Sequence, residues 1–124
     1  MAYVLIVEDE AVLARSIARA LTNLGHVVTV SRTLKEGEQV FAEQRPDLAL
    51  LDMELPDGNG LDLLARWTTR DPRARILVMT AYTDPEYAER ALELGARACV
   101  HKPMDLNSLA STVTAVLTDA KLGS

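Results

Sequence analysis

The sequence lacks several features that mark other classes of protein. It contains one cysteine, Cys99, among 124 residues, so no disulfide can form within the chain, as is typical of a reducing compartment. No apolar run approaches the ~20 residues that span a bilayer. The opening, MAYVLIVEDE, lacks the basic flank and the length of a signal peptide. We therefore predict a cytoplasmic protein that contacts no membrane.

Basic residues are also in the minority. Lys and Arg total 13 against 18 Asp and Glu, which gives a net charge of −5 and a pI near 5.0. Domains that bind nucleic acid usually carry a basic stripe. We therefore expect no direct nucleic-acid binding by this domain, although an acidic chain can still bind a cation.

What the sequence does contain is a regular alternation of short apolar runs and helical patterns. Hydrophobic residues make up 48% and charged residues 25% of the chain, as in an ordinary globular domain with one core. Most of the apolar runs are nearly continuous, which is typical of strands in a parallel sheet covered on both faces. The runs are Tyr3–Val7, Val27–Val30, Leu48–Leu51, Ile76–Met79 and Ala98–Val100.

The segments between these runs have the spacing and the boundaries of helices. Apolar residues recur three and four apart from Leu13 to Leu24, and Gly25 follows where a helix would end. Thr33 with Glu36 fits the capping box of a second helix. Three more helices are expected at about Leu61 to Thr68, from Asp84-Pro85-Glu86 to Gly95, and from Asp105 onward.

A helix thus fills every gap between the predicted strands. Parallel neighbours need such crossovers, which are right-handed, and the helices then cover both faces of the sheet. We predict one doubly wound α/β domain over residues 1–124. In this architecture all strands end at the same edge, and ligands bind in the crevice outside that edge.

Polar residues with a coherent chemistry follow four of the predicted strands. Carboxylates that share one crevice repel unless a cation neutralises them, and an all-oxygen set without a Cys/His cluster favours Mg²⁺ over zinc. A metal ion, an ammonium and a hydroxyl can together hold a phosphoryl group, and a carboxylate can be the nucleophile that forms an aspartyl phosphate. In strand order the residues are Glu8 and Asp9, Asp52, Thr80, and Lys102.

In this order and at these positions, the residues resemble the receiver domain of two-component response regulators, as in chemotaxis receivers. The resemblance covers essentially the whole chain and implies a flavodoxin-like (βα)5 fold with strand order 2-1-3-4-5. It also implies a phosphorylation-switched signalling module, rather than an enzyme, whose activation alters a partner-binding or dimerisation surface. The shared motifs are Glu8-Asp9, Asp52, LPDGNG at 55–60, Thr80-Ala81 and Lys102-Pro103.

The resemblance assigns the nucleophile and the metal ligands. Asp52 would accept a phosphoryl group from the phosphohistidine of a histidine kinase or a histidine phosphotransfer protein. Asp9, Asp52 and the backbone carbonyl of Glu54 would bind Mg²⁺, and Glu8 would assist through a water molecule.

The resemblance also assigns the groups around the phosphoryl group. Lys102 would pair with its oxygens, while Thr80 would donate a hydrogen bond to one of them and move on phosphorylation. Ala81 and Glu54 would also border the phosphoryl group, with Glu54 beside the path of the hydrolytic water. A cis peptide bond before Pro103 would place the lysine.

Two positions depart from the family pattern. Cys99 stands where Tyr or Phe usually precedes the lysine by three residues, and Met104 stands where Phe commonly follows Lys-Pro. Both border the face formed by the fourth helix, fifth strand and fifth helix, which is the expected homodimer or partner surface. With a thiol in place of the ring, we expect Thr80 to signal through Tyr82 or the fourth helix instead of an aromatic rotamer change.

Two other functions are open alternatives. One is a pseudo-receiver, a binding module that is not phosphorylated, although every expected chemical residue is present. The other is a phosphohydrolase of the haloacid dehalogenase type, in which a second acid usually follows the nucleophile by two residues. Glu54 occupies that position with a side chain one methylene longer, and the chain leaves no room for a cap domain. Downstream, the partner is either a separate effector or the protein's own output domain.

Other residues that could suggest chemistry have simpler interpretations. His26 begins the second predicted strand, away from the crevice, and Trp67 falls near the end of the third helix, so we predict structural roles for both. His101 neighbours Lys102, but side chains alternate along a strand, so we expect it to point away from the site.

Overall fold

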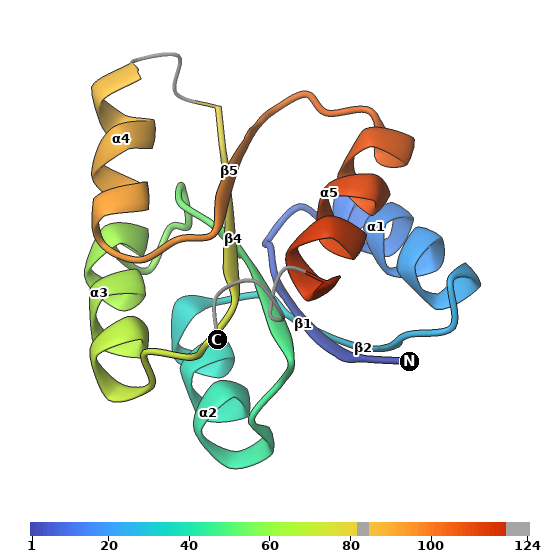
Figure 1. The fold of residues 1–124 in the computed structure, drawn as a ribbon, viewed down its shortest axis with the longest axis horizontal. Helices are drawn as coiled ribbons and strands as arrows, with labels where there is room; N and C mark the ends of the chain where they lie inside the picture. The colour runs from blue at the N-terminus through green and yellow to red at the C-terminus, as the bar shows by residue number, and fades with distance from the viewer. Residues whose placement is uncertain (82–84, 119–124) are drawn as a thin grey trace.

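The computed structural model describes residues 1–81 and 85–118. Five parallel strands form one sheet in the order β2-β1-β3-β4-β5, and a helix follows each strand along the chain (Figure 1). The predicted fold class and strand order are therefore confirmed. The strands are β1 (Tyr3–Val7), β2 (Val27–Ser31), β3 (Leu48–Asp52), β4 (Ile76–Thr80) and β5 (Ala98–His101). The helices are α1 (Ala11–Asn23), α2 (Leu34–Gln44), α3 (Gly60–Arg70), α4 (Pro85–Glu93) and α5 (Leu106–Thr118).

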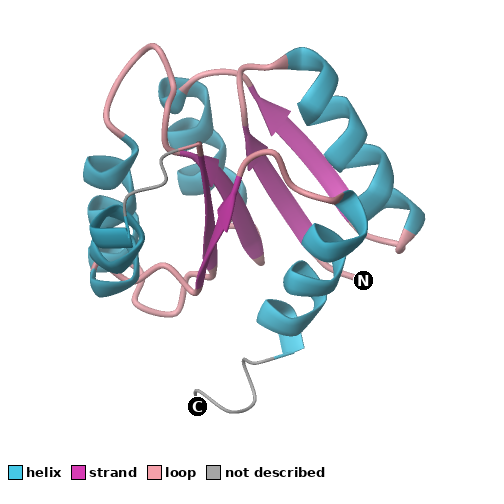
Figure 2. Ribbon diagram, turned by 90° about the horizontal axis from the view of Figure 1, so that it is seen from above, coloured by secondary structure: helices cyan, strands magenta, loops and turns pink. Residues whose placement is uncertain are grey.

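The helices cover both faces of the sheet and create two core layers (Figure 2). One layer lies under α1 and α5, and the other lies under α2, α3 and α4. Along β1, Val4 and Ile6 belong to the first layer, while Leu5 and Val7 belong to the second. Because alternate side chains of a strand face opposite ways, a strand between two helical layers needs an unbroken apolar run.

Burial differs between the centre and the flanks of the sheet. β3 and β4 are buried at every residue, whereas Val27 of β2 is 51% exposed and β5 has no fully buried residue. Coverage on both faces therefore holds for the central strands but not for the two edge strands. β2 and β5 each have a strand neighbour on one side only, so part of their surface meets solvent.

The start of α2 forms a shifted version of the predicted capping box. Thr33 Oγ1 accepts a hydrogen bond from the Glu36 N–H at 3.0 Å, which satisfies one of the free donors of the first turn. The Glu36 carboxylate, however, accepts from the N–H of Arg32 at 3.3 Å rather than from that of Thr33. At the end of α1, Gly25 adopts a left-handed conformation with φ +93°, as expected for a helix terminus.

The later helices begin where side-chain oxygens can cap them. Asn59 accepts from the Leu61 N–H at 2.9 Å, and α3 extends further at both ends than the sequence indicated. Asp105 caps α5 by accepting from the N–H of Asn107 at 3.2 Å. Asp84, the expected cap of α4, lies outside the described residues. None of the helices in the described ranges has the length and apolar character needed to cross a bilayer.

Two residues with predicted structural roles have them. Trp67 is fully buried and stacks on Phe41 of α2, with ring centroids 4.2 Å apart and planes within 2°. His26 accepts a hydrogen bond at Nδ1 from the N–H of Ala2 at 3.1 Å, and it sits at the end of the sheet opposite the predicted site. His101 is exposed at the end of β5.

Candidate functional site

The buried polar side chains of the described residues gather at one edge of the sheet. They are Glu8, Ser31, Asp52 and Thr80. Each occupies the last position of a strand or the position directly after it. Buried polar groups are costly unless they are paired. Their concentration at this edge therefore makes it the candidate functional site.

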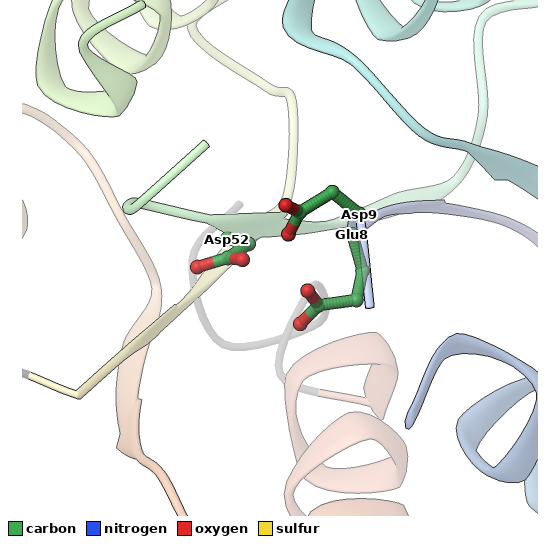
Figure 3. Close-up of side chains that lie close together, drawn as sticks. All are labelled: Glu8, Asp9 and Asp52. Carbon is green, nitrogen blue, oxygen red and sulfur yellow. The ribbon is translucent and has the colours of Figure 1, made fainter. Parts of the chain in front are cut away.

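Three carboxyl groups from two adjacent strands share a small space at this edge (Figure 3). Glu8 and Asp9 follow β1, Asp52 ends β3, and β1 pairs directly with β3. One carboxylate oxygen from each residue lies within 4.8 Å of the other two. Glu8 and Asp52 are buried and Asp9 is exposed, so the cluster opens to solvent on the Asp9 side.

Lys102 supplies the positive charge of the site. Its Nζ lies 2.7 Å from Glu8 Oε1 and 3.0 Å from Asp52 Oδ2, and its side chain is 18% exposed. The Lys102 N–H donates to the Thr80 carbonyl at 2.8 Å, and the peptide bond to Pro103 is cis. Within the described ranges, two of the three clustered carboxyl groups thus share one ammonium, an imbalance that a divalent cation would relieve.

The environment shifts the pKa values of the two buried acids, Glu8 and Asp52, in opposite directions. Burial raises the pKa of Glu8 to about 7, although its hydrogen bond with Lys102 opposes this. Burial also disfavours ionised Asp52, but the Glu54 N–H, side-chain hydrogen bonds with Glu8 and Glu54, and Lys102 together lower its pKa. Burial disfavours the Lys102 ammonium as well, yet the two carboxylates raise its pKa. Asp52 is thus an ionised carboxylate, the form that acts as a nucleophile.

A second group of contacts joins the ends of β3 and β4. Glu54 Oε1 accepts from Thr80 Oγ1 at 3.0 Å and from the Ala81 N–H at 2.5 Å. The Glu54 N–H donates to Asp52 Oδ1 at 3.0 Å. The family resemblance predicted that these residues border one phosphoryl group, but it did not indicate that Glu54 would bind both Thr80 and Ala81. The available signal was spacing, because an acid two residues after a strand end can reach the end of the next strand.

The predicted switch positions are only partly described. Cys99 on β5 is half-buried and packs against the layer under α2, α3 and α4, and burial followed by the charge of Glu54 raises the pKa of its thiol. Tyr82 lies outside the described residues. Met104 packs against the layer under α1 and α5. Tyr87 on α4 lines a surface hollow together with Glu54 and Asp9, and it was not predicted from the sequence.

The sequence matches the model of a family described as the response regulator receiver domain over residues 4–114. This chain belongs to that family. RegA, the photosynthetic apparatus regulatory protein of Rhodobacter capsulatus, is 32% identical over 111 residues, which covers 90% of this chain and 60% of RegA. The transcriptional regulatory protein PhoP of Escherichia coli O157:H7 is 33% identical over 114 residues, covering 92% of this chain and 51% of PhoP. The receiver thus spans about half to three fifths of the length of these relatives.

Solved receiver structures share the fold of this chain. The CheY-like receiver from Methanospirillum hungatei JF-1 has a TM-score of 0.93 at 27% identity, covering 100% of this chain and 99% of that one. The signal receiver domain of a putative Luxo repressor protein from Vibrio parahaemolyticus has a TM-score of 0.92 at 27% identity, covering 98% and 94%. Receivers are signalling domains of two-component systems rather than classical enzymes. Response regulators receive signals from histidine kinases and work with output domains, and their receivers bind Mg²⁺ at an acidic pocket.

Proposed function

We propose that this receiver is switched by phosphorylation of Asp52, with a histidine kinase or a histidine phosphotransfer protein as the phosphoryl donor. The observation that carries the proposal is the environment of Asp52. Asp52 is 1% exposed, and its carboxylate accepts from the Glu54 N–H at 3.0 Å and lies 3.0 Å from Lys102 Nζ. A buried carboxylate that stays ionised beside an ammonium suits attack on an anionic phosphoryl group.

In the proposed transfer, one carboxylate oxygen of Asp52 attacks the phosphorus of the phosphohistidine and forms an acyl phosphate. The bond between phosphorus and the imidazole nitrogen breaks, and its electron pair stays on that nitrogen, which takes up a proton. Lys102 pairs with the phosphoryl oxygens, while Thr80 and the Ala81 N–H donate hydrogen bonds to them. This transfer and the later hydrolysis of the acyl phosphate are the only reactions that we assign to the domain.

The acidic cluster fits a magnesium ion. The clustered oxygens of Glu8, Asp9 and Asp52 are hard ligands, and oxygen ligands are those that Mg²⁺ prefers. We assign direct binding to Asp9, Asp52 and the carbonyl of Glu54, and binding through a water molecule to Glu8. When bound, the ion would neutralise carboxylate and phosphoryl charge at the site.

We propose that the signal leaves through the face formed by α4, β5 and α5, which would bind a partner or a second copy of the domain. The motivating observation is the thiol of Cys99, where an aromatic ring would otherwise report the movement of Thr80. We expect α4 or Tyr82 to carry the change instead. Crystal structures with and without a phosphoryl mimic test this, because an inward swing of Cys99 with α4 unmoved would contradict it.

The wider context is also part of the proposal. We place residues 1–124 as one receiver domain of a cytoplasmic response regulator that acts on a separate effector or on its own output domain. PhoP, named as a transcriptional regulatory protein, is a relative of which this chain covers 51%, and this supports an output domain. We assign to the receiver itself no direct binding to nucleic acid and no contact with a membrane.

The two alternatives make different use of the same residues. In a phosphohydrolase of the haloacid dehalogenase type, the acid after the nucleophile acts on the substrate, whereas Glu54 here is engaged by Thr80 and Ala81. A pseudo-receiver would have no need for three clustered carboxylates beside a half-buried lysine. The contacts of Glu54 and those of the carboxylate cluster with Lys102 therefore both favour a phosphorylated receiver.

Intact-mass spectrometry after incubation with Mg²⁺ and acetyl phosphate tests the proposal. We expect one adduct of ~80 Da on the wild type and none on Asp52→Ala. Asp62→Ala, which removes an exposed acid from the first turn of α3, is the matched control and should keep the adduct. An adduct on Asp52→Ala would contradict the assignment, no adduct on the wild type would favour the pseudo-receiver, and sustained release of phosphate from esters would favour the hydrolase.

A further inference from the structure

We propose that the Glu54 carboxylate stands in for a phosphoryl oxygen in the unphosphorylated receiver and competes with the incoming phosphoryl group. This inference rests on the proposed function, because it concerns the donors assigned to that group. Glu54 would thus be a residue that sets how readily the site accepts a donor, in addition to its position beside the nucleophile.

The contacts of Glu54 are those expected of an oxygen of the bound phosphoryl group. A single oxygen, Oε1, accepts from both Thr80 Oγ1 and the Ala81 N–H, at 3.0 and 2.5 Å. A carboxylate oxygen and a phosphoryl oxygen are both anionic acceptors, and both are bound best by charge-assisted hydrogen bonds. Thr80 is fully buried, so its hydroxyl requires an acceptor even when no phosphoryl group is bound.

The same contacts show why the carboxylate can be displaced. The second oxygen, Oε2, is buried without a hydrogen-bond partner among the described residues. Leaving a buried acceptor unpaired costs free energy, so the position that Glu54 occupies is not fully satisfied, and this favours its displacement. A phosphoryl group offers three oxygens, and Lys102 Nζ lies close to its attachment point at Asp52. The competition therefore favours the phosphoryl group once it is attached.

The surroundings provide space for the displaced side chain. Glu54 lines a surface hollow together with Met53, Asn59 and Tyr87 of α4. Its charge also reaches Cys99 on β5, where it contributes to the raised pKa of the thiol. Movement of this carboxylate would therefore change the charge presented to α4 and β5, which form the proposed output face.

One consequence concerns the order of events at the site. Thr80 and Ala81 already direct their donors toward the position of a phosphoryl oxygen before phosphorylation. Phosphorylation would then exchange one anionic acceptor for another and expel the carboxylate of Glu54. The signal would begin with the departure of Glu54, rather than with recruitment of Thr80 alone.

An NMR experiment tests the stand-in without any phosphoryl transfer. The ¹H–¹⁵N spectrum of the metal-free receiver should show the Ala81 amide shifted strongly downfield, since its proton is donated to a carboxylate. Glu54→Ala should move this resonance upfield, while Glu54→Gln, whose amide oxygen can still accept, should move it less. Glu10→Gln removes an exposed neighbouring acid whose side chain makes no capping bond to α1, and it should leave the Ala81 amide unchanged.

The rate of labelling by acetyl phosphate with Mg²⁺ tests the competition. We expect Glu54→Ala to react about tenfold faster than the wild type, because a tenfold change corresponds to about 1.4 kcal/mol, within the range of the net contribution of one intramolecular hydrogen bond. Glu54→Gln should fall between the two, and Glu10→Gln should match the wild type. All of these variants retain the backbone carbonyl of Glu54 that we assign to the metal.

The possible failures are distinguishable. An unmoved Ala81 amide in Glu54→Ala would overturn the stand-in, as would a Glu54→Ala variant that is labelled no faster than the wild type. Equal rates for Glu54→Gln and Glu54→Ala would also overturn it, because charge repulsion alone would then explain the effect. If the wild type forms no adduct at Asp52, the proposed function fails, whatever the Ala81 amide shows.

Discussion

The amino and carboxyl edges of the sheet both bind polar groups, but they do so in opposite ways. At the amino edge, the Tyr3 N–H donates to Asp47 Oδ2 at 2.7 Å in an exposed contact. At the carboxyl edge, Glu8 and Asp52 are buried and share the single ammonium of Lys102. The first arrangement secures the ends of strands, whereas the second leaves charge that a cation or a phosphoryl group can use.

The difference separates contacts that stabilise the fold from contacts that can bind a ligand. An exposed hydrogen bond contributes a little to stability and attracts no ligand. A buried cluster with more acids than cations lowers the stability of the folded protein. Mg²⁺ that binds this cluster relieves the repulsion and therefore stabilises the folded state. Changes at the carboxyl edge should therefore depend on metal and pH, and changes at the amino edge should not.

Removal of the shared cation should have the largest effect. In EDTA near neutral pH, Lys102→Ala should lower the free energy of unfolding by about 3 kcal/mol, because it leaves two buried carboxylates without their partner. Added Mg²⁺ should restore part of the loss. Urea unfolding with and without Mg²⁺ measures both, and Lys35→Ala, at an exposed lysine, is the control. If Lys102→Ala lowered the free energy of unfolding equally with Mg²⁺ and with EDTA, the carboxyl edge would not differ from the amino edge in its dependence on metal.

Removal of the Glu8 carboxylate should raise the free energy of unfolding, and the size of this effect should depend on pH. Burial raises the pKa of Glu8 from 4.5 to about 7, so its contribution to folding stability is fully present below about pH 4.5 and is lost as the pH rises through about 7. Glu8→Gln lacks this loss and should be more stable than the wild type in EDTA by about 2 kcal/mol near pH 8.

The pH series provides the check on this prediction. Near pH 5 the Glu8→Gln variant and the wild type should have similar free energies of unfolding, because Glu8 is then protonated in the folded state. Glu10→Gln should show no such trend. A constant difference across the pH range would contradict the prediction.

The amino edge should respond weakly and uniformly. Asp47→Ala removes the acceptor of the Tyr3 N–H and should cost about 1 kcal/mol, as is typical of one hydrogen bond. Urea unfolding should give the same loss with Mg²⁺ and with EDTA, and labelling by acetyl phosphate should be unchanged. A loss that varies with Mg²⁺ would mean that the two edges are coupled.

The smallest expected effect concerns Cys99. Burial and the charge of Glu54 raise the pKa of the thiol, so the folded protein has less of the thiolate that reacts with iodoacetamide. Alkylation, followed by mass spectrometry near pH 8, should be slower in the folded protein than in urea. Glu54→Gln should speed it about twofold by removing a nearby negative charge, and equal rates in all samples would contradict the assigned cause.

Apolar continuity predicted the strands well because the central strands lie between two helical layers. The predicted ends were short by one residue in four strands, which continue to Ser31, Asp52, Thr80 and His101. Backbone pairing does not depend on side-chain polarity, so the ladder extends past the apolar run. As a result, Asp52 and Thr80 are the last residues of strands rather than the first residues of loops, which makes their backbones part of the sheet.

The sequence predicted which carboxylates lie together at the site, but it did not predict the hydrogen bonds between the site residues. The positions of Glu8, Asp9 and Asp52 at the carboxyl ends of parallel strands predicted that their carboxylates lie at one edge of the sheet, and the structure shows that cluster. The order of the strands came from family resemblance, since periodicity alone does not specify it. The bonds from Glu54 to Thr80 and Ala81 depend on side-chain torsions that no sequence pattern encodes.

The stacked pair beneath α2 and α3 has a practical consequence. Trp67 is the only tryptophan of the chain, and it is sealed against Phe41 away from solvent. Its fluorescence should therefore report the opening of that core layer during urea unfolding, without an added label. The receiver thus carries an intrinsic optical probe whose emission should change when the protein unfolds and stay nearly constant when only the acidic site is occupied.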